Sequence, residues 1–292
     1  VSAARDHDRA SAPSPSVRPP RFTQHPQPRP TISIATHPLL KTQRKLKTET
    51  LNTGALSSTG GIAIISDIHS NVDALAAVLT DITEQRCFAI FCLGDTVGYG
   101  PEPAACVKLM REFAAINLMG NHEAMYLATR GAREKLGPQE FGDLWPPLEL
   151  CHRQIGASDS KWIADLPLVV PLADMTLVHG SLHEPQTFDY IVEKPMAKAH
   201  FAKQETRASF YGHTHIPAIW QEKGKTIACY APGEGPIGLD PDCRYAIGVG
   251  SVGQPRDDDP RACYVIHHPG SDRVEFRRVP YDVNKAQARF AK

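Results

Sequence analysis

Apolar runs alternate with amphipathic segments along the chain from Gly61 onward. Residues 61–66, 87–93 and 114–119 are short apolar runs, as expected of strands that are covered on both faces of a sheet. Residues 72–82 carry apolar positions at helical spacing, and residues 103–113 also suit a helix. The pattern predicts alternating strands and helices, as in an α/β protein.

The pattern changes in the second half of the chain. Residues 124–166 have a largely helical composition, and residues 168–178 give two strand-like runs. A helix near residues 197–205 and a strand at residues 208–211 follow. The chain then turns into short β-runs with tight turns, at residues 219–221, 226–230, 245–249, 262–266 and 274–279. We expect these last strands to form a second, mostly antiparallel sheet.

The first sixty residues differ from the rest. They are rich in proline and carry nine Lys or Arg against three acids, without sustained hydrophobic periodicity. Such a segment buries too little apolar surface to offset the entropy of an ordered chain. We therefore expect residues 1–60 to be a disordered basic leader, with a faint resemblance to a transit peptide, and residues 61–292 to form the folded domain. Whether residues 1–60 belong to the mature protein stays open.

The composition narrows the partners and the compartment. Thirty-two basic residues balance thirty-two acidic ones, so the net charge of the chain does not attract a nucleic-acid polymer or anionic lipids. The seven cysteines are odd in number and show no CxxC pair, which favours free thiols in a reducing cytoplasm over a disulfide framework. No stretch approaches the roughly 18 to 20 apolar residues of a membrane helix. We expect a cytoplasmic protein with no membrane partner and leave its oligomeric state open.

Five short clusters place metal-ligand side chains beside glycines at the ends of apolar runs. They contain Asp67 and His69, Asp95, Asn121 and His122, His179, and His213 and His215. Ligands of open α/β sheets bind where strands end, so separate loops can converge on one site. Asp, Asn and His without thiolate suit Mn²⁺, Fe²⁺, Zn²⁺, Co²⁺ or Ni²⁺. We expect two divalent ions, held about 3.5 to 4 Å apart by a shared Asp95, in a phosphoester hydrolase.

Each cluster also has a simpler interpretation. Asp67 and Asp95 suit turns, and Asn121 suits the N-cap of a helix. The occurrence of all five clusters together, with His213 and His215 on one side of an extended segment, favours the metal site. We leave the neighbouring histidines and acids out of the predicted set and interpret them as surface or core residues. These are His183, Glu184, His200, His267 and His268.

The clusters read SDIHSN, GDTVGYGPEP, GNHE, HGS and GHTH in chain order. This order resembles the calcineurin-like metallophosphoesterase superfamily, over residues 61 to about 279. Together with GSVGQPRD it is most similar to the compact prokaryotic phosphodiesterase branch, with some likeness to diadenosine tetraphosphatases and Ser/Thr protein phosphatases. The resemblance implies an α/β fold, a four-layer α-β-β-α sandwich of two mostly mixed β-sheets flanked by helices.

The resemblance also implies roles for the clustered residues. The first metal ion is held by Asp67, His69 and His215, and the second by Asn121, His179 and His213, with Asp95 bridging them. His122 is then the residue that protonates the leaving oxygen or stabilises transition-state charge, and the nucleophile is a metal-activated hydroxide. Mn²⁺ is the expected ion, with Fe, Zn, Co or Ni as alternatives. Substrate-binding residues stay unassigned.

Other functions remain open at this point. A metal-dependent binding or assembly module on the same scaffold should have lost Asp95, Asn121 or His122, and none is lost. The expected substrate is a small phosphoester, either a monoester or a diester. The glycine-rich residues 250–254 resemble a phosphate cradle without a P-loop signature, and Arg256 could reach a phosphate oxygen. Residues 257–259 are interpreted as a solvated acidic turn.

Overall fold

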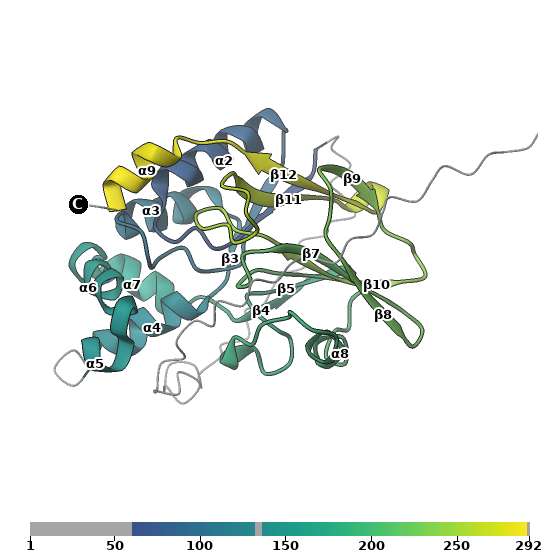
Figure 1. Ribbon diagram of the computed structural model, residues 1–292, viewed down its shortest axis with the longest axis horizontal. Helices are drawn as coiled ribbons and strands as arrows, with labels where there is room; N and C mark the ends of the chain where they lie inside the picture. The colour runs from purple at the N-terminus through teal and green to yellow at the C-terminus, as the bar shows by residue number, and fades with distance from the viewer. Residues whose placement is uncertain (1–59, 132–135, 291–292) are drawn as a thin grey trace, which may run out of the picture.

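Two six-stranded β-sheets face each other, and helices cover their outer sides (Figure 1). The computed structural model describes residues 60–131 and 136–290. The predicted leader at residues 1–60 therefore lies, except for Gly60, outside the described residues. The predicted four-layer α-β-β-α sandwich of mixed sheets is confirmed.

The first sheet has the strand order β3-β2-β1-β11-β12-β9. Its strands are β1 (Ile62–Ile65), β2 (Ala89–Cys92), β3 (Ile116–Asn117), β9 (Gly235–Gly238), β11 (Ala262–His268) and β12 (Arg273–Val279). β1, β2 and β3 are parallel, and β11, β12 and β9 continue the sheet in antiparallel pairs. The carboxyl ends of β1, β2 and β3 consequently meet at one edge, where the first three predicted clusters begin.

The second sheet has the order β4-β5-β6-β10-β7-β8. Its strands are β4 (Val169–Pro171), β5 (Met175–Val178), β6 (Ala208–Tyr211), β7 (Pro217–Lys223), β8 (Thr226–Tyr230) and β10 (Arg244–Val249). β5, β6 and β10 are parallel, whereas β4, β7 and β8 pair antiparallel. The ends of β5 and β6 supply the remaining two clusters.

The prediction that the C-terminal strands form a sheet of their own is wrong. β7, β8 and β10 join β4, β5 and β6, whereas β9, β11 and β12 complete the first sheet. Positions 262–267 of β11 are all buried, because β11 is a central strand between β1 and β12. The hydrophobic pattern of the sequence predicts that β11 is buried, but it does not predict which strands pair with β11. β9, with the sequence GPIG, carries no strand pattern and forms by pairing with β12.

Alternate residues of each strand face different layers. In β1, Ile62 and Ile64 belong to the core between the two sheets, together with Phe210 of β6. Ala63 and Ile65 belong to a second core, which the first sheet forms with its helices. Both faces of β1 are thereby buried, as the continuous apolar run predicts.

The helices fall into three groups around the sheets. They are α2 (Val72–Glu84), α3 (Pro103–Phe113) and α9 (Val283–Phe290) on the first sheet, α8 (Lys194–Phe201) on the second, and α4 (Asn121–Arg130), α5 (Pro138–Phe141), α6 (Trp145–Gln154) and α7 (Ala157–Ala164) at one end (Figure 1). The predicted helix at residues 197–205 begins earlier, at Lys194, and ends at Phe201. α9 was not predicted from the sequence.

Two further predictions can be compared with the structure. All seven cysteines are free thiols, in agreement with the expected absence of a disulfide framework. Within the described ranges, every helix is too short or too polar to cross a membrane.

Candidate metal centre

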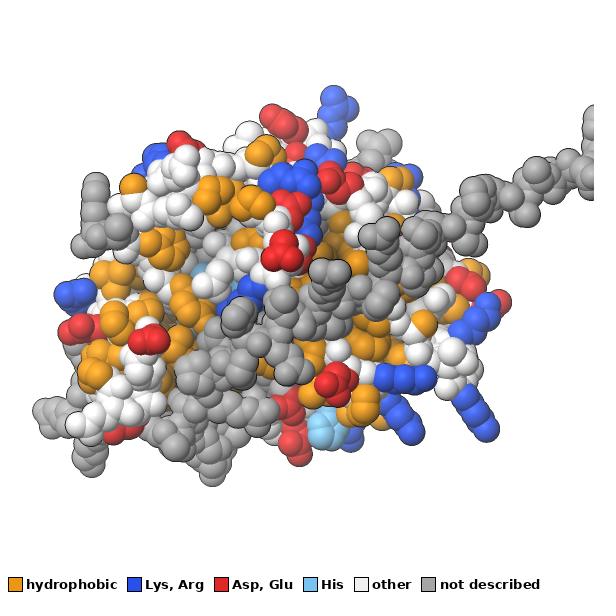
Figure 2. All heavy atoms as spheres, viewed as in Figure 1, with side chains coloured by type: hydrophobic (Ala, Val, Ile, Leu, Met, Phe, Trp, Pro, Cys, Tyr) orange, Lys and Arg blue, Asp and Glu red, His pale blue; other side chains and the backbone are white. Residues whose placement is uncertain are grey.

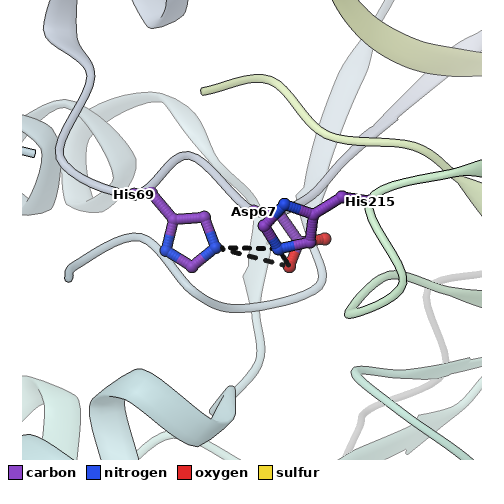
Figure 3. A group of neighbouring side chains, drawn as sticks. All are labelled: Asp67, His69 and His215. Carbon is purple, nitrogen blue, oxygen red and sulfur yellow. Dashed lines mark hydrogen bonds and ion pairs between the residues drawn. The ribbon is translucent and has the colours of Figure 1, made fainter. Parts of the chain in front are cut away.

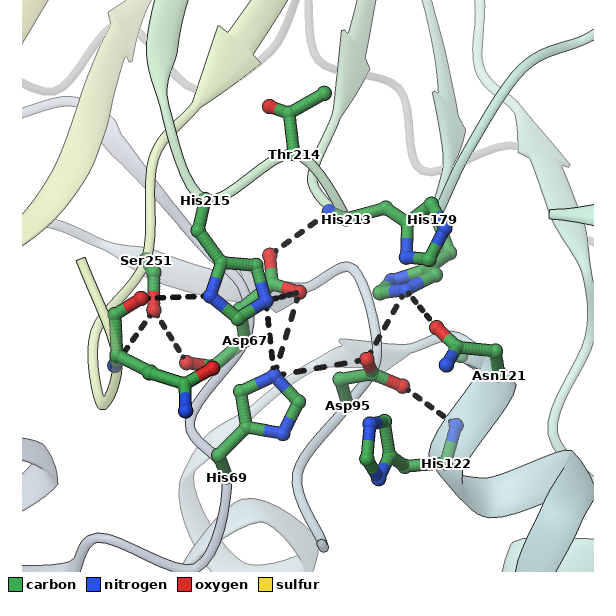
Figure 4. Close-up of polar contacts among 12 residues, drawn as sticks. Asp67, His69, Asp95, Asn121, His122, His179, His213, Thr214, His215 and Ser251 are labelled. Carbon is green, nitrogen blue, oxygen red and sulfur yellow. Dashed lines mark hydrogen bonds and ion pairs between the residues drawn. The ribbon is translucent and has the colours of Figure 1, made fainter. Parts of the chain in front are cut away.

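Five loops bring all eight predicted site residues to one place, at the carboxyl ends of strands from both sheets (Figure 4). Asp67 and His69 follow β1, Asp95 follows β2, Asn121 and His122 begin α4, His179 follows β5, and His213 and His215 follow β6. All are buried except the half-buried Asn121. The topology thus gathers side chains that are widely separated in sequence.

The loops that carry these residues have left-handed backbone conformations. The φ angles of Asp67, His69 and Asp95 are 55°, 47° and 53°. His213 and His215 have φ angles of 63° and 59°, so the prediction of an extended segment is wrong there. The two rings nevertheless lie on the same side, because the intervening Thr214 points away (Figure 4). Left-handed non-glycine residues are strained and concentrate at functional sites.

Asp67, His69 and His215 form a first group of ligand atoms (Figure 3). The Nε2 atoms of His69 and His215 are 3.0 Å apart. Asp67 Oδ1 lies 3.2 Å from His215 Nε2 and 3.8 Å from His69 Nε2. Oδ1 is buried and accepts no hydrogen bond from the described residues. Three electron-pair donors therefore converge on one point, which suits a divalent cation.

Asp95, His179 and His213 form a second group of ligand atoms. Asp95 Oδ2 lies 3.3 Å from His179 Nε2, and Asn121 Oδ1 lies 3.1 Å from the same nitrogen. The carbonyl oxygen of Asn121 thus faces this group and can serve as a further oxygen ligand. The donors are again imidazole, carboxylate and amide.

Asp95 belongs to the second group and also faces His69 of the first. Its Oδ2 atom is 3.7 Å from His69 Nε2 and 3.3 Å from His179 Nε2. Its other oxygen, Oδ1, accepts a 2.8 Å hydrogen bond from the backbone N–H of His122. One oxygen is thereby held by the backbone of α4, and the other faces both groups, as a bridging ligand requires.

Backbone carbonyls orient three of the imidazoles. Nδ1 of His69 lies 3.2 Å from the Val97 carbonyl oxygen, and Nδ1 of His179 lies 3.0 Å from that of Leu93. Nδ1 of His215 lies 2.6 Å from the carbonyl oxygen of Gln254. A carbonyl can only accept, so each Nδ1 donates and each Nε2 faces the centre. This arrangement is typical of metal-binding histidines.

His122 packs beside the first group, and with His69 and Asp95 it forms a further cluster of candidate ligand atoms. Its ring centroid lies 4.7 Å from that of His69 and 4.6 Å from that of Tyr99. Gly98, with φ +91°, comes so close that a Cβ atom there would lie 2.0 Å from His122 Nδ1. The glycine-rich loop after β2 therefore accommodates the His122 ring.

Glu123 has a positioning role that sequence reasoning missed. Its Oε2 atom accepts hydrogen bonds from the backbone N–H groups of Asp95 and Gly120, at 2.8 and 2.9 Å. Its Oε1 atom accepts from Val97, at 3.1 Å. One buried carboxylate thus ties the loop after β2 to the start of α4. Its place three residues after Gly120, the spacing of a capping box, could have indicated this contact.

The electrostatics suit cation binding. Burial alone would raise the pKa of Asp67, but His215, His179 and His213 bring it below its usual value. Burial lowers the pKa of His213 to about 3 and holds that of His69 well below its usual value. Ionised carboxylates and neutral imidazoles are the forms that bind metal ions.

His179 and Asp95 behave as a charged pair. Burial would lower the pKa of His179, but Asp95 raises it to about 9. Burial would likewise raise the pKa of Asp95, and His179 and His122 lower it. A cation that binds the second group must therefore displace a proton from His179.

The glycine-rich residues 250–254, which resemble a phosphate cradle in sequence, contact the turn after β1 through the amides of Val252 and Gly253. The N–H of Val252 donates to Ser66 O at 3.0 Å, and that of Gly253 donates to Asp67 O at 2.9 Å. The Ser251 hydroxyl also donates to Asp67 O, at 2.8 Å. The amides that would form a cradle are used to hold the turn after β1.

The other histidines lie outside the two groups. His200 is a core residue, with Nδ1 accepting from the Leu182 N–H at 3.0 Å and Nε2 2.8 Å from the Ser209 hydroxyl oxygen. His267 is buried on β11. His183 and Glu184 lie in the loop after His179 and belong to neither group. Their omission from the predicted ligand set agrees with these positions.

Comparison with known proteins places this fold and site in a family. The model of the calcineurin-like phosphoesterase superfamily domain matches residues 61–272. An uncharacterized protein from Methanocaldococcus jannaschii is 34% identical over 235 residues, which cover 79% of this chain and 92% of that protein. The chain belongs to the calcineurin-like phosphoesterase superfamily, as the resemblance predicted.

Solved structures agree with this assignment. A metallophosphoesterase from Sphaerobacter thermophilus is 36% identical, with a TM-score of 0.70, over 80% of this chain and 94% of that one. A hypothetical protein from Pyrococcus horikoshii shares the fold, with 19% identity and a TM-score of 0.61, over 79% of this chain and 92% of that one.

Proposed function

We propose that this protein is a dinuclear-metal-dependent hydrolase of a small phosphoester, a phosphatase or a phosphodiesterase. The observation that carries the proposal is the position of Asp95 Oδ2, which faces His69 of one ligand group and His179 of the other. Such a shared carboxylate is the arrangement that two-metal phosphoesterases need. Mn²⁺ is the ion we propose, because the donors are oxygen and imidazole nitrogen without thiolate.

The residues would divide the work as follows. Asp67, His69 and His215 would hold one ion, Asn121, His179 and His213 the other, and Asp95 both. When bound, the ions would supply Lewis-acid polarisation of the phosphoryl group and activation of water for in-line attack. The protein fixes the position of this chemistry because the ligands are buried and their rings are oriented by backbone carbonyls.

His122 is the proposed proton donor to the leaving oxygen. Burial lowers its pKa to about 4, against the opposing effect of Asp95. The negative charge of a bound phosphoryl group would raise this pKa, so that the ring takes up a proton from solvent and can then donate it to the leaving oxygen. Its backbone N–H is already used by Asp95, so the imidazole is free to act on substrate without disturbing the bridging carboxylate.

The retention of Asp95, Asn121 and His122 supports an enzyme over a binding or assembly module. A small substrate is favoured over a nucleic-acid polymer by the balanced charge of the chain. The free thiols support the reducing, cytoplasmic location that we propose. Diadenosine polyphosphates and phosphoproteins remain candidate substrates alongside simpler phosphoesters.

The test is hydrolysis by the full chain after removal of metal and reloading. Protein reloaded with Mn²⁺, Co²⁺, Ni²⁺ or Zn²⁺ should hydrolyse p-nitrophenyl phosphate, bis(p-nitrophenyl) phosphate or both, and chelated protein should not. Asp95→Asn is the matched variant, because it keeps the shape of the side chain but weakens both ion sites. If every reloaded sample is as inactive as the chelated control on both esters, the proposal is wrong.

A further inference from the structure

Arg256 is a half-buried arginine without a carboxylate partner among the described residues. Every other half-buried arginine in the described ranges pairs with an acid. These are Arg207, Arg244, Arg261, Arg277, Arg278 and Arg289. Burying a guanidinium is costly unless an anion compensates it. The exception therefore points to an anion that the described residues do not supply.

The acids next to Arg256 in sequence are already used. Asp257 pairs with Arg278, and Asp259 pairs with Arg261 at 2.7 Å. The prediction that residues 257–259 form a simple solvated turn is thus wrong for these two acids, and only Asp258 is exposed. Because Asp257 and Asp259 pair with other arginines, neither acid compensates the charge of Arg256.

Neutral groups hold Arg256 beside the candidate metal centre. Its backbone N–H donates to the His215 carbonyl oxygen at 3.3 Å, and Nη2 donates to Gln254 Oε1 at 2.8 Å. Arg256 also lies near the hydroxyl of Tyr190: burial raises the pKa of Tyr190, and the positive charge of Arg256 opposes that rise. Tyr190 stacks flat on His213, with ring centroids 4.1 Å apart and an interplanar angle of 6°.

These contacts place the guanidinium within electrostatic range of the whole site. After burial and neighbouring histidines, its charge contributes to the lowered pKa of both His69 and His122. Figure 2 shows a blue cationic side chain beside pale-blue imidazole surface near the middle of this face. Gln254 accepts from only one of the nitrogens of the guanidinium, which carries five N–H donors.

We propose that Arg256 is a substrate-binding residue whose guanidinium binds the non-bridging oxygens of the phosphoryl group, with Gln254 holding it in place. Its planar fork matches two phosphate oxygens. A unit positive charge attracts a dianionic group more strongly than a monoanionic one. Arg256 therefore favours phosphomonoesters, or terminal phosphates, over phosphodiesters. This inference rests on the proposed hydrolase function.

The test uses Arg256→Gln and Arg256→Lys in the full chain. Arg273→Gln is the matched control, because Arg273 is exposed and lies far from the ligand loops. It is the cross-strand neighbour of His268. That end of β11 lies beside the start of β1, whereas the ligand loops follow the ends of the strands. Three quantities are measured with the same metal in every sample. They are kcat and KM on p-nitrophenyl phosphate and on bis(p-nitrophenyl) phosphate, and the Kd of inorganic phosphate by calorimetry.

Arg256→Gln should raise the phosphate Kd and the monoester KM by about 10- to 100-fold, the usual effect of removing a hydrogen bond between charged groups. The diester KM should change less, the bound metal should be unchanged, and Arg256→Lys should recover part of the phosphate affinity. Arg273→Gln should behave as the parent protein.

An unchanged phosphate Kd in Arg256→Gln would overturn the proposal. An equal loss on the monoester and the diester would overturn the preference for a dianion. If the parent protein hydrolyses neither ester but binds phosphate through Arg256, the hydrolase proposal fails while the anion contact stands.

Discussion

Several side chains at the site depend on residues that do no chemistry themselves. Gly120 allows the start of α4 to approach Asp95, because a Cβ atom on Gly120 would lie 2.2 Å from Asp95 Oδ1. Gly98 gives the same freedom to the His122 ring. The absence of a side chain at Gly120 and Gly98 therefore fixes the positions of Asp95 and His122.

Gly98→Ala should displace His122 without unfolding the protein. The added Cβ would overlap the ring, and the φ angle of +91° is strained for alanine. We expect turnover to fall toward that of a protein without the imidazole, measured as kcat with reloaded metal. Gly131→Ala is the matched control, because a Cβ atom there meets nothing within 4 Å. Equal activity of the two variants would show that the loop adjusts freely.

His122→Ala should slow the reaction of poor leaving groups by about 10² to 10⁴, the usual contribution of general acid catalysis. Metal content should stay constant, because Asp95 is held by the backbone N–H of residue 122 and not by its ring. Elemental analysis and kcat on alkyl and nitrophenyl esters check the two statements. A variant that loses metal in proportion to activity would instead make His122 a ligand.

At the scale of elements, the loop after β5 is supported from behind by α8. His200 of α8 accepts from the Leu182 N–H in that loop and contacts Ser209 of β6. Burial lowers the pKa of His200 to about 3, from an ordinary value near 6.5. The folded state therefore requires the neutral ring.

This requirement predicts a pH dependence of stability. The unfolded chain binds a proton at His200 near pH 6.5, and the folded protein binds it only near pH 3. The stabilisation is complete above pH 6.5 and is lost as the pH falls toward 3, at up to about 1.4 kcal/mol per pH unit. His200→Asn, whose Oδ1 can still accept from Leu182, should flatten the unfolding free energy between pH 6 and 4. Urea titrations in chelator check this, and parallel curves for the two proteins would contradict it.

The sequence predicted the positions of the strands better than it predicted which strands pair with each other. Apolar runs identified the strands that end at the ligand loops, because burial on both faces leaves a clear pattern in β1 and β2. The sheet to which β11 belongs could not be inferred, since β1 lies about two hundred residues earlier in the chain. The candidate ligand residues could be proposed from their residue types, whereas the contacts of Glu123 and Tyr190 are defined only by the folded chain.

At the scale of the whole molecule, both sheets and all eight predicted site residues lie within residues 60–290. A variant that begins at Gly60 should therefore keep kcat/KM within about twofold of the full chain, because it retains every residue proposed to hold the ions or to act on substrate. Steady-state assays on both nitrophenyl esters check this. A large loss with unchanged metal content would assign the first 59 residues a part in catalysis.

Each ligand group takes side chains from both sheets: Asp67 and His69 come from the first and His215 from the second. Asp67 and His213, joined by a hydrogen bond, are 146 positions apart in the chain. Neither group can assemble on a nascent chain until β6 has been synthesised and both layers have docked, and closing so long a loop is slow. Any cation that these two groups bind would consequently be captured late in biogenesis, and its capture would report that the protein has finished folding.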